Sequence, residues 1–241
     1  MRIFLAGASG VIGLRLTPLL VRMGHEVTGT TRAPAKAAGI AARGARPVVV
    51  DVFDRAALTA AVVAASPEVV IHQLTDLPDV IDPQKLAAAL DANARLRIEG
   101  TANLMAAARE AGARRVIAQS IAFAYAGGPE PHGEDDALNV GADGAPGRTA
   151  AGVAALEAAV LGAPPIEGIV LRYGRLYGPG TWTATLNDRA PLHVDAAAYA
   201  AMLALTRGAP GIYNIAEDDG AVSIAKARAM LGFDPAVRLE A

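Results

Sequence analysis

Short apolar runs alternate with longer helical stretches along almost the whole chain, and this alternation limits the possible folds most strongly. The expected strands are unbroken and rich in β-branched residues, as in Val48-Val49-Val50 and Val69-Val70-Ile71. Such strands are typical of parallel sheets that helices cover on both faces. The order therefore predicts an α/β fold with a doubly wound parallel sheet and right-handed crossovers, and it excludes a helical bundle or a β-sandwich.

The pattern of apolar residues also gives approximate bounds for each element. The expected strands are Arg2–Ala6, Glu26–Thr30, Pro47–Val50, Glu68–His72, Arg114–Gln119 and Ile166–Arg172. The expected helices are Val11–Met23, Pro34–Ala42, Asp54–Ala65, Pro83–Ala111 and Thr149–Leu161. The segment Gly127–Arg148 is rich in Gly, Pro and Asp, so we expect a long loop there that is functional or mobile.

Composition excludes several classes of protein. The 241 residues, of which 53% are hydrophobic, suffice for one sizeable core. The net charge of −2 indicates no general affinity for nucleic acid or an anionic membrane. The apolar run at the N-terminus is too short for a signal peptide, and no apolar run is long enough for a membrane span. Cysteine is absent, which fits a cytoplasmic location, and the four histidines show no metal-ligand spacing, so we expect no metal site.

A glycine-rich segment, Gly7-Ala8-Ser9-Gly10-Val11-Ile12-Gly13, links the first expected strand to the first expected helix. In such a turn, backbone N–H groups and the positive end of the helix dipole face a pyrophosphate. Gly7 permits the tight turn, Gly10 leaves room for the phosphate, and Gly13 lets the helix pack close to the sheet. We therefore expect a Rossmann-type dinucleotide site at Gly7, Ser9, Gly10, Val11, Ile12 and Gly13. The alternative is a tight turn that binds no phosphate.

The residues after the second strand indicate which dinucleotide binds. NAD-specific sites usually place an acidic residue there to hold the ribose 2′-hydroxyl, but residues 27–50 contain no Asp or Glu. Arg32 follows Thr30-Thr31 directly, where its planar fork could donate two hydrogen bonds to a 2′-phosphate. NADP is therefore the expected cofactor and NAD the alternative, and a solvated surface role for Arg32 stays open.

Four further residues complete the expected cofactor-binding set. Asp51 follows the third strand, where it could accept a hydrogen bond from the adenine amino group or cap the next helix. Val52 stands beside it, and Gln73 and Leu74 follow the fourth strand.

Several segments occur in the same order as in a known group of enzymes. They are Gly7–Gly13, Asp51-Val52, Val70-Ile71-His72, Gly100–Leu104, Leu171–Pro179, His193–Asp195 and Leu231–Pro235. In these segments the chain resembles the extended short-chain dehydrogenases/reductases of the NAD-dependent epimerase/dehydratase group. The resemblance covers nearly the whole chain and says nothing about the substrate.

The resemblance implies a catalytic Ser/Thr–Tyr–Lys set, in which the tyrosine transfers a proton and the lysine lowers its pKa. In this family a glutamate usually follows the lysine by four residues, and Glu157 fits that position. Val153 then occupies the lysine position and Thr149 the tyrosine position. The serine or threonine position falls on Ile121, beside Ser120. We therefore expect that the usual proton relay cannot operate.

The C-terminal part of the chain is shorter than the resemblance implies, because only a short stretch separates Trp182 from Pro191. We expect a dinucleotide-binding core at residues 1–172 and a small, truncated substrate lobe at 173–241. This lobe would be interleaved with the last core strand and helix to form one compact unit. The pocket would then be unusually open, or another subunit would complete it in a homodimer.

Other side chains could supply the missing chemistry. Tyr173 and Tyr177 lie beyond the sixth expected strand, at the edge of the sheet where ligands bind. Together with Ser120 they form the expected catalytic set; packed tyrosines with satisfied hydroxyl groups are the alternative. Arg172 could bind an anionic substrate or pair with a carboxylate. His72, at a strand end, is expected to be a hydrogen-bonded structural residue.

Two functions stay open. The first is an NAD(P)-dependent oxidoreductase or epimerase that acts on a small carbonyl or sugar-like substrate with non-standard catalytic residues. The intact segment Arg172–Pro179 favours it, and it is the function we prefer. The second is a catalytically inactive relative that senses a dinucleotide or binds a partner, which the triple substitution favours. The expected partner is a small-molecule substrate, not nucleic acid or a membrane.

Overall fold

A parallel sheet of seven strands forms the centre of the computed structural model, which describes residues 1–78, 82–185 and 188–239. The strand order is β3-β2-β1-β4-β5-β6-β9. The strands are β1 (Arg2–Ala6), β2 (Glu26–Thr31), β3 (Arg46–Val49), β4 (Val69–His72), β5 (Arg115–Ile121), β6 (Glu167–Tyr173) and β9 (Gly211–Ile215). The order reverses between β1 and β4, which makes their carboxyl ends the point where ligands bind in such sheets. The doubly wound fold predicted from the sequence is confirmed.

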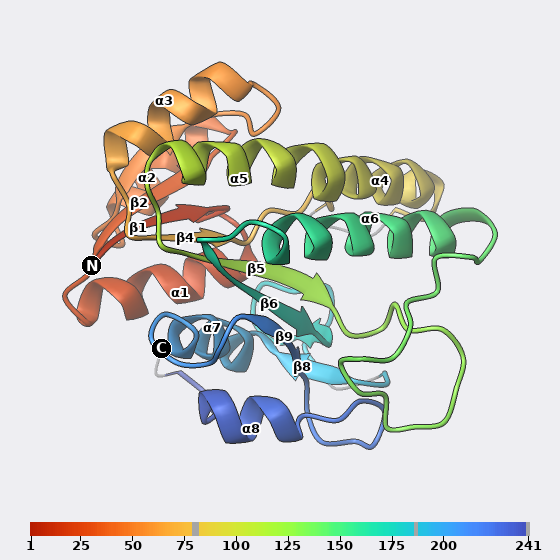
Figure 1. Cartoon of the computed structure of the whole chain (residues 1–241). Coiled ribbons are helices and arrows are strands. Elements are labelled where there is room, and N and C mark those ends of the chain that lie inside the picture. The colour runs from red at the N-terminus through yellow and green to blue at the C-terminus, as the bar shows by residue number, and fades with distance from the viewer. Residues whose placement is uncertain (79–81, 186–187, 240–241) are drawn as a thin grey trace.

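Helices cover both faces of the sheet (Figure 1). One layer consists of α3 (Arg55–Ala65), α4 (Pro83–Arg95), α5 (Thr101–Glu110) and α6 (Gly144–Leu161). The other contains α1 (Val11–Arg22), α7 (Val194–Leu203) and α8 (Ala225–Leu231). The short helix α2 (Ala37–Ala41), preceded by the turn Pro34–Lys36, connects β2 to β3. In the described chain no helix is both long and apolar enough to cross a membrane.

Side chains of β1 show why both faces must be covered. Ile3 and Leu5 pack with residues of α1 and α7, whereas Phe4 packs with residues of α3 and α5 on the opposite face. All three side chains are buried. Because successive side chains of a strand point to opposite faces, an unbroken apolar strand requires two helical layers.

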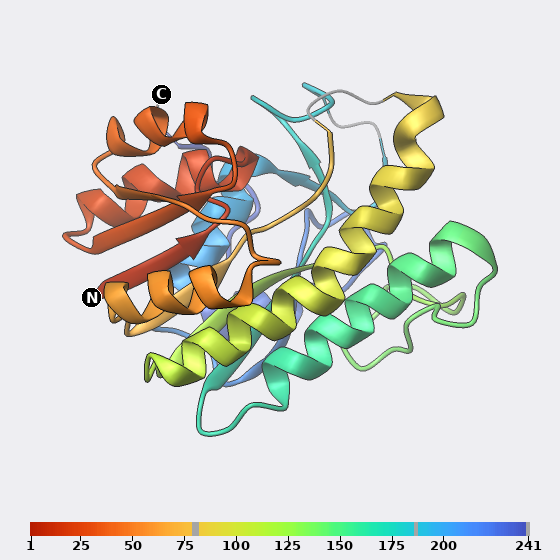
Figure 2. The ribbon, with the colours of Figure 1, turned by 90° about the horizontal axis from the view of Figure 1, so that it is seen from above.

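The helices α4, α5 and α6 position the part of the molecule that matters most for the site. A π-helical segment, η2 (Leu96–Gly100), joins α4 to α5. Figure 2 shows this continuous helical rod lying beside α6 across one face of the sheet. The close approach of α6 to α4 depends on Gly152 of α6, because a Cβ added there would lie 3.2 Å from the Cα of Ala94 in α4.

Helix α6 begins earlier than the sequence analysis expected, at Gly144 rather than at Thr149. Pro146 lies in its first turn, where the missing N–H costs nothing because such groups lack partners inside the helix. The expected loop Gly127–Arg148 is therefore shorter at its C-terminal end.

This loop is docked onto β9. His132 accepts a hydrogen bond from the Asn214 side chain through its backbone oxygen, and Glu134 accepts one from the Asn214 backbone N–H. These contacts hold the loop against the last strand of the main sheet.

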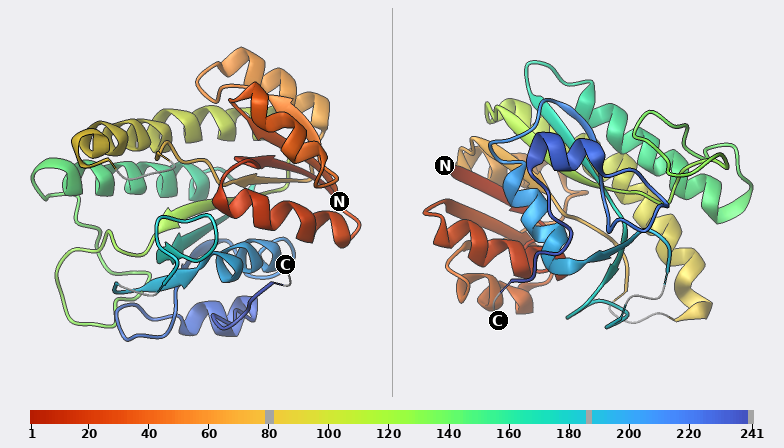
Figure 3. Two further views of the ribbon diagram at one scale, coloured as in Figure 1. Left: turned by 180° about the vertical axis from the view of Figure 1, so that it is seen from behind. Right: turned by 90° about the horizontal axis from the view of Figure 1, so that it is seen from below.

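Three strands lie outside the six that the sequence analysis named. β9 extends the main sheet beside β6, and β7 (Arg175–Tyr177) pairs with β8 (Pro191–His193) in a separate parallel pair. His193 ends β8 and accepts a hydrogen bond from Asp195 N, so it caps α7. The tail then returns past α7 toward α1, and Leu239 N donates to the Asp195 carboxylate (Figure 3).

Candidate cofactor and substrate site

The glycine-rich segment forms a tight turn between β1 and α1. Gly7 has a φ of +92°, and its N–H donates to Thr30 Oγ1 at 3.2 Å. No side chain caps α1, which starts at Val11 directly after the turn. The first N–H groups of an uncapped helix are free to bind an anion, and the helix dipole favours negative charge there.

Two glycines of the turn are needed for different reasons. A Cβ added to Gly13 would lie 2.2 Å from the Gly7 carbonyl oxygen, so the protein itself requires glycine there. This close approach is to the turn itself, through Gly7 and Ala8, whereas the sequence analysis expected it between helix and sheet. A Cβ on Gly10 would meet the chain no closer than 3.4 Å. The chain could therefore accommodate a side chain at Gly10, and only a molecule outside the chain gives a reason for glycine there.

The carboxyl end of β2 carries hydroxyl and basic groups. Ser9 donates a hydrogen bond to Thr31, with 3.0 Å between the hydroxyl oxygens. Arg32 has a side chain that is 63% exposed, and its guanidinium pairs with Asp76 at 2.5 Å. A 2′-phosphate would therefore compete with the Asp76 carboxylate for Arg32.

Asp51 and Val52 lie near this edge, after β3. The Asp51 side chain is exposed and accepts a hydrogen bond from Phe53 N, while Asp54 caps α3 by accepting from Ala57 N. The alternative of Asp51 as the helix cap is thus wrong, because Asp54 fills that place. Val52 is buried, and its backbone oxygen accepts from Asn103.

Gln73 and Leu74 follow β4, at the switch point beside the glycine turn. A Cβ on Gly7 would lie 2.6 Å from the Gln73 carbonyl oxygen. Gln73 Nε2 donates to Tyr173, but Gln73 Oε1 is enclosed and has no partner among the described residues. Leu74 N donates to His72 Nδ1, and His72 Nε2 lies 3.0 Å from Thr101 Oγ1. His72 is therefore a hydrogen-bonded structural residue, as the sequence analysis expected.

A buried ion pair joins β5, β6 and α6. Glu157 accepts hydrogen bonds from Arg172 Nε and Nη2 at 2.8 and 2.7 Å, and from Ser120 Oγ at 2.8 Å. Burial lowers the pKa of Arg172, but the hydrogen bonds and charge of Glu157 outweigh this, so the pKa lies above its ordinary value. Of the two roles that the sequence left open for Arg172, the structure shows the carboxylate pair.

The two tyrosines expected to donate a proton occupy separate places. Tyr173 is 1% exposed, accepts from Gln73 and donates to the Ala197 backbone oxygen. Burial raises the pKa of Tyr173 above its ordinary value. Tyr177 donates to Glu217 and accepts from Arg238, beside the C-terminal tail. The structure therefore does not bring Tyr173, Tyr177 and Ser120 together into one catalytic group.

At the positions that the resemblance assigns to the proton relay, the residues do not form a Ser/Thr–Tyr–Lys set. Val153 is fully buried and packs with Ile121, Ala124 and Ala150. Thr149 lies one turn earlier on α6 and is half-buried. The three lysines of the chain, Lys36, Lys85 and Lys226, belong to other elements, so none of them lies on α6.

One charged residue at this edge was missed by the sequence analysis. Arg97 lies in η2 and is 8% exposed. It could have been noticed from its spacing, because Asn93, Arg97 and Thr101 recur every four residues on the buried face of one helical rod.

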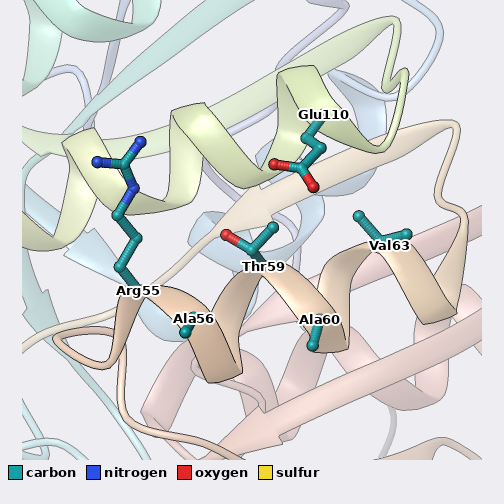
Figure 4. Close-up of a pocket in the computed structure, with 6 residues that line it drawn as sticks. All are labelled: Arg55, Ala56, Thr59, Ala60, Val63 and Glu110. Atoms are coloured by element: carbon teal, nitrogen blue, oxygen red, sulfur yellow. The ribbon is translucent and has the colours of Figure 1, made fainter.

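A surface groove between α3 and α5 lies apart from this edge. Arg55, Ala56, Thr59, Ala60, Val63 and Glu110 line it, as Figure 4 shows. Most of these residues are exposed, and none belongs to the glycine turn or to the buried ion pair. Among the described residues no cluster of three His, Asp or Glu side chains is arranged to hold a metal ion.

The seven-stranded parallel sheet, its switch point and the uncapped glycine turn define a Rossmann-type dinucleotide-binding protein. The model of the NAD dependent epimerase/dehydratase family matches residues 3–191. The chain belongs to this family.

Two proteins that are similar in sequence to this chain are named as reductases. The chain is 43% identical over 242 residues to a 3-diazoavenalumate denitrifying reductase from a Streptomyces species, covering 92% of this chain and 77% of the relative. It is 31% identical over 272 residues to a dTDP-4-dehydrorhamnose reductase from Streptomyces griseus, covering 98% and 78%.

Solved structures confirm the fold at lower identity. A UDP-glucose 4-epimerase from Thermus thermophilus in complex with NAD has a TM-score of 0.81 at 20% identity, covering 99% of this chain and 95% of the other. The same enzyme from Thermotoga maritima, with UDP-glucose, has a TM-score of 0.80 at 17% identity, covering 99% and 94%.

Proposed function

We propose that this protein is an NAD(P)H-dependent reductase whose substrate accepts a hydride without a proton from the protein. The observation that carries the proposal is the apolar cluster in place of the relay, with Val153 and Ile121 buried against each other. A bound nicotinamide would supply the hydride. The chain would hold the dinucleotide at the uncapped turn Gly7–Gly13.

The hydroxyl groups of Tyr173, Ser120 and Thr149 are poor proton donors, which supports a reaction that needs no proton from the protein. Tyr173 is buried with a raised pKa, and the Ser120 hydroxyl group is already engaged in a hydrogen bond that it donates to Glu157. A threonine such as Thr149 does not ionise usefully near neutral pH. Reduction of a carbonyl group needs both a hydride and a proton, and general acid catalysis contributes about 10²–10⁴ in rate. A carbonyl or sugar-like substrate would therefore turn over slowly here.

An aromatic diazo compound can accept a hydride without also needing a proton. This is the substrate class in the name of the Streptomyces relative. Replacing a diazonium group by hydrogen forms one C–H bond and breaks one C–N bond. The hydride supplies the electron pair of the new bond, the pair of the broken bond leaves with neutral dinitrogen, and no proton is consumed. The active site then has only to bind, orient and exclude water, which an apolar wall does well.

NADP is the cofactor that we propose over NAD. Residues 27–50 contain no acid to hold a ribose 2′-hydroxyl, and Arg32 is exposed at the end of β2. An arginine there suits a 2′-phosphate because its fork makes charge-assisted hydrogen bonds.

The test is an assay with deuterated NADPH and two substrates, an ortho-diazophenolate and a simple aromatic aldehyde. We expect deuterium on the aromatic ring and release of dinitrogen from the first, above the rate without protein. The aldehyde should react at least about a hundredfold more slowly, the lower bound for losing a general acid.

Thr149→Ala serves as the control variant in this assay and should leave the diazo reaction nearly unchanged. Fast aldehyde reduction that collapses in Thr149→Ala would show that the helix α6 carries a relay after all. No turnover of either substrate, with NADPH bound, would favour the inactive, dinucleotide-sensing alternative.

A further inference from the structure

Arg97 is a buried cation without a counter-ion of its own. It is 8% exposed, and in the described part of the chain its guanidinium makes no hydrogen bond or ion pair. Burying an arginine without hydrogen bonds is costly, so such a side chain calls for an explanation.

The neighbouring carboxylate is already neutralised. Both oxygens of Glu157 accept hydrogen bonds from Arg172, and Ser120 donates to one of them. Glu157 influences Arg97 only through its charge. Two guanidinium groups thus share one carboxylate, which leaves one positive charge in excess beside the carboxyl ends of β4 and β5.

Among the described residues, Glu157 is the one acidic group whose charge acts on Arg97. Burial, with a smaller contribution from the charge of Arg97, lowers the pKa of His72 to about 4, so this imidazole is neutral at pH 7. On α6 the residue one turn before Glu157 is the apolar Val153. Burial lowers the pKa of Arg97 to about 10, and the guanidinium still keeps its proton near neutral pH.

The Arg97 guanidinium is not fully enclosed. The fully enclosed polar side-chain atoms without a partner, in the chain as described, are His25 Nε2, Gln73 Oε1 and Asp195 Oδ1. The Arg97 nitrogens are not among them, so they retain some access although the residue is nearly buried. Arg97 lies on η2, which packs against α6 at the ligand-binding edge of the sheet.

We propose that Arg97 binds an anionic oxygen of the substrate, a phenolate or a carboxylate, and so selects for an acidic aromatic compound. This inference rests on the proposed function, in that a substrate occupies this edge of the sheet. The planar fork of arginine suits an oxyanion, and the low-dielectric surroundings strengthen the attraction. Bound here, the anion would balance the excess positive charge.

The test measures binding without turnover, using three probes at about pH 8: benzoate, para-nitrophenolate and neutral para-nitroanisole. We expect the unmutated protein to bind at least one anion and not the neutral probe. Arg97→Met should weaken anion binding by about tenfold or more, and Arg97→Lys by less, because it keeps the charge and loses the fork. Which anion binds identifies phenolate or carboxylate as the group recognised.

Arg95→Met is the matched control, because Arg95 is an exposed arginine on α4 that pairs with Glu99. It should leave anion binding unchanged. The melting temperature of Arg97→Met should not fall, since removing an unpaired buried charge relieves its desolvation. A purely structural Arg97 would show the opposite, a fall in melting temperature with unchanged anion affinity.

Three results would overturn the proposal: anion affinity that survives in Arg97→Met, no anion binding by the unmutated protein, or an equal loss of affinity for NADPH. The last would assign Arg97 to the cofactor. Because no turnover is needed, a protein that binds anions through Arg97 but does not reduce diazo compounds would refute the proposed function alone.

Discussion

Gly10 is the residue whose side chain would compete most directly with a dinucleotide. Its φ of −83° suits any residue, and an added Cβ would only touch the Gly7 oxygen at 3.4 Å. Gly10→Val should therefore fold with nearly unchanged stability and lose dinucleotide binding, because the new side chain occupies the place of the pyrophosphate. Calorimetric titration with NADPH and thermal melting would measure both effects.

Gly13→Ala is the matched control for this prediction. Its new Cβ would lie 2.2 Å from the Gly7 oxygen, so the turn must shift and the melting temperature should fall. If Gly10→Val binds NADPH as well as the unmutated protein, the dinucleotide, if any, binds elsewhere.

Arg32 decides the choice of cofactor if the 2′-phosphate displaces Asp76 from it. We expect the unmutated protein to bind NADPH more tightly than NADH, and Arg32→Glu to reverse this order. The loss of a charge-assisted contact should cost about 1.5–3 kcal/mol in NADPH binding, with a smaller effect at high salt.

Arg46→Glu changes the charge by the same amount and is the control for Arg32. Arg46 starts β3, at the opposite end of the strands, where it donates to Thr28. It should leave the preference between NADPH and NADH unchanged. Equal affinity for the two dinucleotides in the unmutated protein would contradict the assignment of Arg32.

At the scale of the elements, local patterns predicted the strands β1 to β6 and the helices α1 to α6, whereas the buried helix α7 and the short helix α8 lie outside the expected helices. β1 was predicted with its observed bounds, and β2 to β6 lie close to theirs. β7 and β8 have three residues each, which is too short for any periodicity to appear. β9 was not predicted because the polar Asn214 interrupts its apolar pattern. Asn214 is buried through hydrogen bonds to partners distant in the sequence, which are the hydroxyl group of Tyr125 and the loop residues His132 and Glu134.

The candidate site was predictable where one segment builds it and not where several segments meet. The glycine turn is local, so its sequence alone indicated the tight conformation of Gly7. The pair of Glu157 and Arg172 joins α6 to β6, and only the fold brings it together. Arg97 depends on both effects, since its helical spacing is local but its lack of a partner follows from the bonding of Glu157 elsewhere.

The stability of the whole molecule should depend on pH through His72, the most buried titratable group at the switch point. Its imidazole bonds to Thr101 and accepts from Leu74 N, while Arg97 lies nearby and adds a positive charge. Burial first, and Arg97 second, lower its pKa from 6.5 to about 4. The unfolded chain therefore takes up a proton at His72 in a range of pH where the folded chain does not.

The sign of this effect follows from proton linkage. Between pH 6.5 and about 4 the unfolded state binds more protons at His72, so the free energy of unfolding decreases as the pH falls and the contribution levels off below the folded pKa. From pH 7 to pH 5 the loss should be about 2 kcal/mol, at 1.36 kcal/mol per unit of pKa difference. The variant His72→Gln tests this effect, because its amide can still form a hydrogen bond to Thr101 and does not titrate.

Denaturant unfolding of both proteins at pH 7 and pH 5 would measure the difference. The variant should be less stable at pH 7 because of imperfect packing, yet its free energy of unfolding should fall by about 2 kcal/mol less on acidification. Parallel pH profiles for the two proteins would mean that His72 titrates alike in the folded and unfolded states, and that its burial at the end of β4 does not keep it neutral.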